Sequence, residues 1–173
     1  MGRVGVDQRD GLPRERMMET RGILILGVGN LLRKDDGVGV QAVQRLQGLS
    51  LPGGVKVVDG GAAGIGLLDM LEGFERAVII DAADMGLDPG SVVKFGPDAI
   101  RFRSPELRLS LHSADVAGVL ELARLLGKRL PDMAVIGVQP SDTGWGTEMS
   151  VEVLAEMRHI VDLVLEEIGY CRT

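Results

Sequence analysis

The chain has 173 residues, of which 45% are hydrophobic and 25% charged, and its net charge is −6. A chain of this length and composition can bury enough surface to fold as one domain without a disulfide or a structural metal. The acidic balance disfavours nucleic-acid binding, which requires a basic patch. The single cysteine, Cys171, excludes a disulfide framework, a zinc ribbon or an iron–sulfur site within one chain.

The first 20 residues lack the apolar core of a secretory signal. No stretch of the chain approaches the roughly 20 consecutive apolar residues of a membrane span. We therefore expect a cytoplasmic protein without a membrane partner. Because residues 1–20 show no hydrophobic period, they are predicted to form a flexible N-terminal tail, and residues 21–173 to form a single α/β domain.

Short aliphatic runs alternate with helical patterns through the first half of this domain. The predicted strands cover residues 23–26, 55–58 and 77–80, and the predicted helices cover residues 38–49 and 67–71. This strand–helix–strand–helix–strand order is typical of a parallel sheet with right-handed crossovers and helices on both faces.

The second half completes the sheet. Residues 91–95 follow the tight turn Asp88-Pro89-Gly90, which is too short for a parallel crossover, so we expect a strand antiparallel to the third strand and next to it. Residues 97–112 are irregular and are expected to carry function. A helix over 114–126, a strand over 134–138 and an amphipathic helix over 150–168 follow. The predicted fold class is α/β, a three-layer α/β/α sandwich with a mostly parallel five-stranded sheet and one antiparallel strand.

Carboxylates stand where the first and third strands end. Asp35 and Asp36 follow the first strand, and Asp81 ends the third. In an open α/β sheet these two strands commonly flank the reversal of strand order, where ligands bind at the carboxyl ends. We expect one of Asp35 and Asp36 to cap the helix that follows them. Helix capping does not explain why a charged residue, Asp81, stands at the end of an aliphatic strand.

The two histidines have different surroundings. His159 shares the polar face of the last helix with acidic residues and is predicted to be a solvated surface residue. His112 precedes a helix, where it is either a loop residue beside an N-cap or a functional group. Two carboxylates and one imidazole at this edge, from Asp36, Asp81 and His112, would suit a borderline divalent ion such as nickel, zinc or manganese. Three ligands leave coordination positions open.

Two other kinds of site are disfavoured. Gly27 and Gly29 follow the first strand as in a dinucleotide-binding loop, but Leu32 occupies the third position that requires a small residue. A Ser-His-Asp triad is disfavoured because the chain has no G-x-S-x-G motif. A non-catalytic α/β protein that senses a metal or a nucleotide remains an alternative.

The segment from Gly27 to Gly39, GVGNLLRKDDGVG, resembles the signature of the hydrogenase maturation endopeptidases, which process the large subunit of nickel–iron hydrogenases. The resemblance covers about residues 22–168 and continues through shorter motifs, which are Asp59-Gly60-Gly61, Gly64, Ile79-Ile80-Asp81-Ala82, His112-Ser113-Ala114-Asp115, Gly137-Val138-Gln139-Pro140 and Trp145-Gly146-Thr147-Glu148-Met149-Ser150. It implies an α/β/α fold with a mixed sheet and a metal-contacting trio of Asp36, Asp81 and His112. Asp36 stands where some family members have Glu.

The resemblance also implies an activity. Family members remove a short C-terminal extension from the large-subunit precursor after iron and nickel have been inserted. The implied role of the trio is to sense nickel held by substrate thiolates, with no permanently bound cofactor. Asp36 and Asp81 are the catalytic candidates for an aspartic-type endopeptidase, and either an activated water or a metal-polarised carbonyl is compatible with them. A peptidyl-tRNA hydrolase is disfavoured, because its Asn-Pro-Gly turn and its histidine after the first strand are missing.

Overall fold

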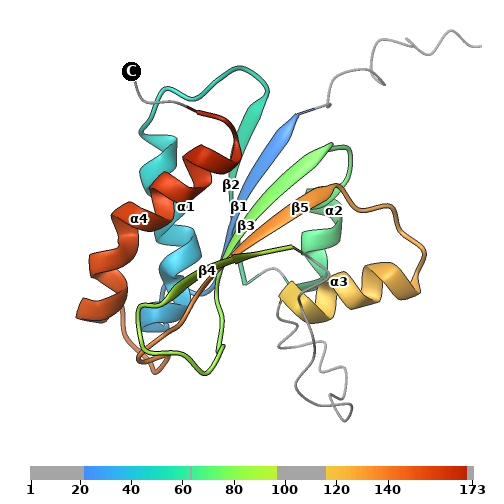
Figure 1. Cartoon of the computed structure of the whole chain (residues 1–173). Coiled ribbons are helices and arrows are strands. Elements are labelled where there is room, and N and C mark those ends of the chain that lie inside the picture. The colour runs from blue at the N-terminus through green and yellow to red at the C-terminus, as the bar shows by residue number, and fades with distance from the viewer. Residues whose placement is uncertain (1–21, 63, 97–115, 171–173) are drawn as a thin grey trace, which may run out of the picture.

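The computed structural model describes residues 22–62, 64–96 and 116–170. It contains a five-stranded sheet in the order β2-β1-β3-β5-β4, with helices on both faces (Figure 1). The strands are β1 (Ile23–Val28), β2 (Val55–Gly61), β3 (Arg76–Ala82), β4 (Val92–Phe95) and β5 (Asp132–Val138). Neighbouring strands from β2 to β5 are parallel, and β4 runs antiparallel to β5. The predicted α/β class and mixed sheet are confirmed.

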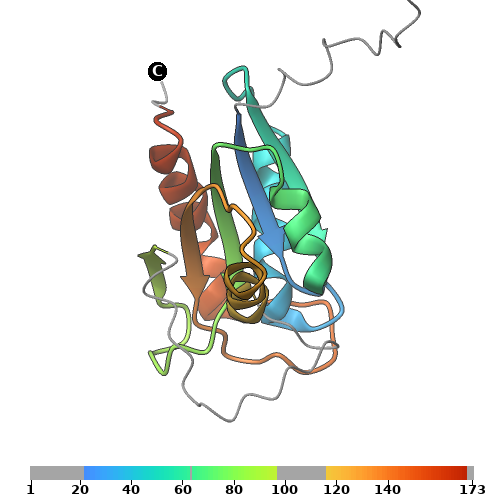
Figure 2. The same cartoon turned by 90° about the vertical axis from the view of Figure 1, so that its right-hand side faces the viewer.

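Two helical layers enclose the sheet (Figure 2). Helices α1 (Val38–Gln47) and α4 (Val151–Glu167) cover one face, and α2 (Leu67–Leu71) and α3 (Val116–Leu125) cover the other. Short 3-10 helices, η2 (Lys34–Gly37) and η3 (Gly64–Gly66), precede α1 and α2. Successive strand residues point to opposite faces, so Val78 and Ile80 of β3 enter the α1/α4 core while Ala77 and Ile79 enter the α2/α3 core.

The position of β4 differs from the prediction. It pairs with β5 and not with β3, because β1 and β5 already occupy both edges of β3. The chain after β3 instead crosses the end of β5, where the backbone N–H of Ala83 donates to the carbonyl of Val138 at 2.9 Å. The N–H of Gly90 then donates to the carbonyl of Gln139, also at 2.9 Å.

The helix predictions agree closely with the structure. The predicted boundaries of α2 are those observed. The apolar face predicted for α4 is buried apart from Leu154, which is 48% exposed, and Ile168, which follows the helix and is partly buried. His159 is exposed, as predicted. None of the described helices is long and apolar enough to cross a membrane. The predicted tail of residues 1–20 and the predicted functional segment 97–112 lie outside the described residues.

Candidate active site

The order of the strands reverses between β1 and β3. The chain first adds β2 on one side of β1 and then β3 on the other side. The carboxyl ends of β1 and β3 therefore lie side by side, with Gly27 opposite Ile80 in the parallel register. This is the switch point that the sequence predicted, and Asp81 is the residue that follows Ile80. Ligands of open α/β sheets bind at such a point.

The start of α1 packs directly onto this edge. A Cβ atom added to Gly39 would lie 2.2 Å from the carbonyl oxygen of Ile80 and 2.4 Å from that of Val28. Only glycine permits so close an approach of two backbones. The 3-10 helix η2, which carries Asp36 and leads into α1, also contacts β3. Local packing thus brings the segment that carries Asp36 to the edge where Asp81 lies.

Asp36 is held by its own loop. One carboxylate oxygen, Oδ2, accepts a hydrogen bond of 2.8 Å from the backbone N–H of Asn30, and the side chain is half-buried. Gly29 has a φ of +129°, and a Cβ atom there would lie 1.7 Å from the carbonyl oxygen of Asp36. The glycine-rich loop therefore closes on its own backbone, which agrees with the argument against a dinucleotide site.

Asp81 is half-buried near the end of β3. Strand alternation places it on the same face as Ala77 and Ile79, which is the face that α2 and α3 cover. The third predicted ligand, His112, lies outside the described residues. Within residues 22–62, 64–96 and 116–170, no group of three or more His, Cys, Asp or Glu side chains could hold a metal ion. The structure thus brings together the elements that carry two of the three predicted residues.

The prediction that Asp35 or Asp36 caps the following helix was wrong. No side chain caps η2 or α1. Asp35 is instead fully buried, and its carboxylate accepts hydrogen bonds from three backbone N–H groups, those of Ser141 at 2.9 Å, Asp142 at 2.9 Å and Ser150 at 2.7 Å. Asp35 therefore ties the loop after β1 to the segment that leads into α4.

The hydrogen bonds of Asp35 determine its charge. Burial by itself would raise the pKa of this carboxyl group. The N–H groups of Asp142, Ser150 and Ser141 favour the ionised form and hold the pKa below its ordinary value of 3.8. The group is thus an ionised structural anchor.

The two connected segments, residues 30–36 and 141–150, form what we call the loop clasp. The backbone of Lys34 donates to the carbonyl of Gly146 at 2.9 Å, and the N–H of Gly146 donates to the carbonyl of Leu32 at 3.0 Å. Lys34 also forms an ion pair with Asp142, which raises the pKa of the lysine and lowers that of the aspartate. Lys34 has a φ of +44°, a conformation that costs free energy and that these contacts hold in place.

Gln139, which follows β5, supports the segment that follows Asp81. Its side chain is buried, and Oε1 accepts hydrogen bonds from the N–H groups of Met85 at 2.7 Å and Leu87 at 3.2 Å. The amide nitrogen, Nε2, donates to Asp84 Oδ1 at 3.3 Å. The sequence offered only the motif Gly137-Val138-Gln139-Pro140 as a signal for this residue.

We expect Gln139→Ala to lower the free energy of unfolding by about 1 kcal/mol, because the N–H groups of Met85 and Leu87 lose the buried oxygen that accepts their hydrogen bonds. Urea unfolding measures the loss, and amide exchange at Met85 and Leu87 should accelerate. The exposed His159→Ala serves as a control and should change neither quantity. Unaltered exchange at both amides in the Gln139 variant would show that the side chain does not hold this segment.

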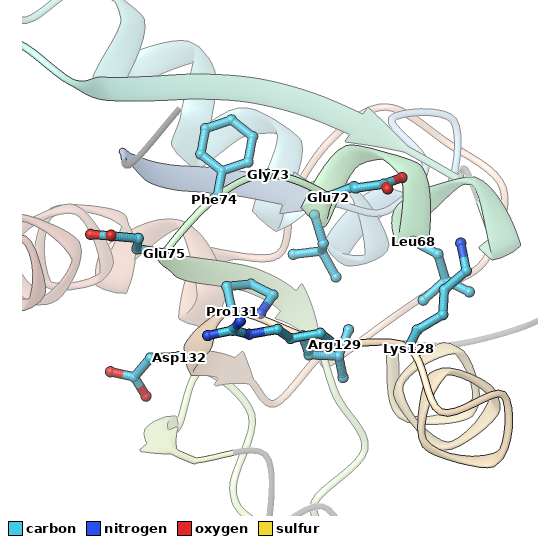
Figure 3. A pocket seen from close by; sticks show the side chains of 11 residues that line it. Leu68, Glu72, Gly73, Phe74, Glu75, Lys128, Arg129, Pro131 and Asp132 are labelled. Atoms are coloured by element: carbon cyan, nitrogen blue, oxygen red, sulfur yellow. The ribbon is translucent and has the colours of Figure 1, made fainter. Parts of the chain in front are cut away.

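A cavity of about 710 Å³ lies at the opposite edge of the sheet (Figure 3). It is lined by the loop before β3, with Glu72 and Phe74, and by the loop before β5, with Lys128 and Arg129. These loops lie at the amino ends of parallel strands, whereas Asp81 lies at a carboxyl end. The cavity is therefore separate from the candidate active site.

Comparisons with known proteins identify the relatives of this chain. The sequence model of the HycI family, described as hydrogenase maturation protease, matches residues 40–167. The match includes Asp81 and His112 and begins after Asp36. The hydrogenase expression/formation protein HupD of Bradyrhizobium diazoefficiens is 34% identical over 149 residues, which are 85% of this chain and 78% of HupD. HoxM of Azotobacter vinelandii is 36% identical over 152 residues, which are 86% of this chain and 73% of HoxM.

Solved structures show the same similarity. The hydrogenase maturating endopeptidase HybD from Escherichia coli superposes with a TM-score of 0.72 at 28% identity, covering 86% of this chain and 92% of HybD. The [NiFe] hydrogenase maturation protease HybD from Thermococcus kodakarensis gives a TM-score of 0.63 at 30% identity, covering 85% of this chain and 99% of that protein.

Proposed function

The chain belongs to the hydrogenase maturation protease family, and we propose that Asp36, Asp81 and His112 let it test its substrate for nickel before cutting. It is a peptidase, and its reaction is the removal of the C-terminal extension from the precursor of a nickel–iron hydrogenase large subunit. This assignment replaces the alternative of a non-catalytic metal- or nucleotide-sensing protein. We place the reaction in the cytoplasm, with the precursor as partner and with no nucleic-acid or membrane partner.

The observation that carries the proposal is the position of Asp81 at the edge against which η2 and its Asp36 are packed. His112 precedes the first residue of α3, Val116, by four positions. Four residues span at most about 14 Å of extended chain. Since α3 covers the sheet face to which strand alternation assigns Asp81, this short reach supports a site made from all three side chains.

The chemistry of these donors suits the proposed substrate. Two carboxylates and an imidazole are acceptable ligands for nickel, and three protein ligands leave coordination positions open. The thiolates of the precursor would occupy those positions, so the precursor brings the nickel and the protease needs no permanently bound metal. An enzyme with this donor set would bind the precursor metal productively only after insertion is complete.

Asp36 and Asp81 are the catalytic candidates. One carboxylate can act as a general base on the attacking water, as in an aspartic-type peptidase. Alternatively, both can orient the nickel of the precursor so that it polarises the scissile carbonyl. In either case the negative charge of the carboxylate is essential, whereas its shape alone is insufficient.

We expect cleavage to depend on the metal state of the precursor. Nickel-loaded precursor should lose its C-terminal peptide, which mass spectrometry detects, while the same precursor prepared without nickel should remain intact. Adding nickel to that second sample under loading conditions is the matched control and should restore cleavage. Equal cleavage rates with and without nickel would contradict the proposed checkpoint but not the peptidase activity.

A further inference from the structure

Large apolar side chains are exposed on the loop clasp. Leu31 is 37%, Leu32 58% and Trp145 77% exposed. Trp145 is the single tryptophan of the chain, and the guanidinium of Arg33 lies 5.7 Å from the centre of its ring. We call this group, Leu31, Leu32, Arg33 and Trp145, the clasp platform. Contiguous exposed apolar groups with a polar surround are typical of protein-interaction sites.

The backbone beneath the platform is fixed. Gly146, the residue after Trp145, is hydrogen-bonded in both directions to the segment of Leu32 and Lys34. Before Trp145, the N–H of Gly144 donates to Asp142 Oδ1 at 2.7 Å. An exposed aromatic side chain on a pre-ordered backbone is a favourable anchor, because less conformational entropy is lost when a partner binds.

The guanidinium of the platform is already hydrogen-bonded within the chain. The guanidinium of Arg33 donates from Nε and Nη2 to the carbonyl of Thr143 at 2.9 and 2.8 Å. The neighbouring Lys34 is paired with Asp142. The hydrogen bonds to Thr143 hold Arg33 in place beside the Trp145 ring, and the other exposed side chains of the platform are apolar, so the surface is suited to an apolar segment.

The platform lies next to Asp36 in the chain. The carbonyl of Arg33 accepts a hydrogen bond of 3.0 Å from the N–H of Asp36. A segment bound on the platform would thus lie beside the loop that presents Asp36. We propose that the clasp platform is the docking surface for an apolar segment of the large-subunit precursor close to its cleavage point, a proposal that rests on the function stated above.

The main test is the kinetics of Trp145→Ala with nickel-loaded precursor. Aromatic anchors contribute strongly to binding, so we expect KM to rise about tenfold or more while kcat changes less than about twofold. Trp145→Phe should recover most of the loss, because it keeps an apolar ring. The matched control is Leu125→Ala, which removes a 70% exposed side chain at the far end of α3 and should leave KM unchanged.

A second readout follows from the single tryptophan. Protein labelled with 5-fluorotryptophan gives one ¹⁹F resonance, which should shift when unlabelled precursor binds. Unchanged KM in Trp145→Ala, or a resonance that does not move at saturating precursor, would overturn the docking surface. If the unmodified protein failed to process the precursor at all, the proposed function would fail instead, so the two failures are distinguishable.

Discussion

Asp81→Asn is expected to reduce processing of nickel-loaded precursor by about a hundredfold or more while the protein stays folded. Asparagine keeps the shape of the side chain but removes the charge that a divalent ion or a general base requires. The backbone pairing of β3 with β1 and β5 does not depend on this side chain. Processing rate and melting temperature should be measured on the same preparation.

Further variants distinguish the loss of an active-site group from a general effect of substitution on processing. Asp36→Asn and His112→Ala should lose processing to a similar degree. Asp36→Glu should retain part of the activity, because glutamate preserves the charge at this position. His159→Ala, on the exposed face of α4, should process normally. A folded Asp81→Asn protein that cleaved the precursor at the full rate would remove Asp81 from the active site.

Asp35→Ala is expected to lower the free energy of unfolding by about 3 kcal/mol or more, a larger effect than for any surface carboxylate. Three backbone N–H groups would lose the buried carboxylate that accepts their hydrogen bonds, and a hydrogen bond to a charged group contributes about 1.5–3 kcal/mol. Asp35→Asn should lose less, because its remaining oxygen can still accept some of these bonds. Urea unfolding at neutral pH measures both variants.

The destabilisation of Asp35→Asn should also depend on pH. Because the pKa of Asp35 is lowered from 3.8 by folding, its stabilising contribution is fully present above that value. The contribution is lost as the pH falls from about 4 through the lower pKa of the folded state. The gap between the parent and Asp35→Asn should therefore be constant above about pH 5 and narrow in more acidic solution.

The exposed turn residue Asp88 provides the comparison for this pH series. Asp88→Asn should match the parent protein in unfolding free energy across the same pH range. Equal stability of Asp35→Asn and the parent at neutral pH would show that the buried hydrogen bonds do not anchor the loop clasp.

Local pattern predicted most of the fold. The run Ile23-Leu24-Ile25-Leu26 is long enough and apolar enough to identify a buried strand, and the spacing of residues 67–71 identifies α2 with its observed ends. The partner of β4 was not predictable in this way. It depends on β5, a strand that comes about forty positions later and occupies the edge of β3.

In the candidate site, too, some features were predictable from the sequence and others depend on distant contacts. The strand-order rule placed Asp36 and Asp81 at one edge, because it needs only the sequence of elements. The true role of Asp35 depends on N–H donors 106 to 115 positions away in the chain. Nothing in the local sequence distinguishes such an anchor from a helix cap. Gln139 and the clasp platform escaped prediction for the same reason, since both are defined by contacts between distant loops.

The nickel environment during substrate binding tests the central claim most directly. X-ray absorption at the nickel edge should be recorded on nickel-loaded precursor alone and on precursor frozen with the protease before cleavage. We predict that the protease adds oxygen or nitrogen ligands to a nickel site that otherwise has thiolates, and that folded Asp81→Asn adds fewer. A nickel spectrum that is unchanged by the bound, active protease would contradict the proposal that this edge of the sheet contacts the metal.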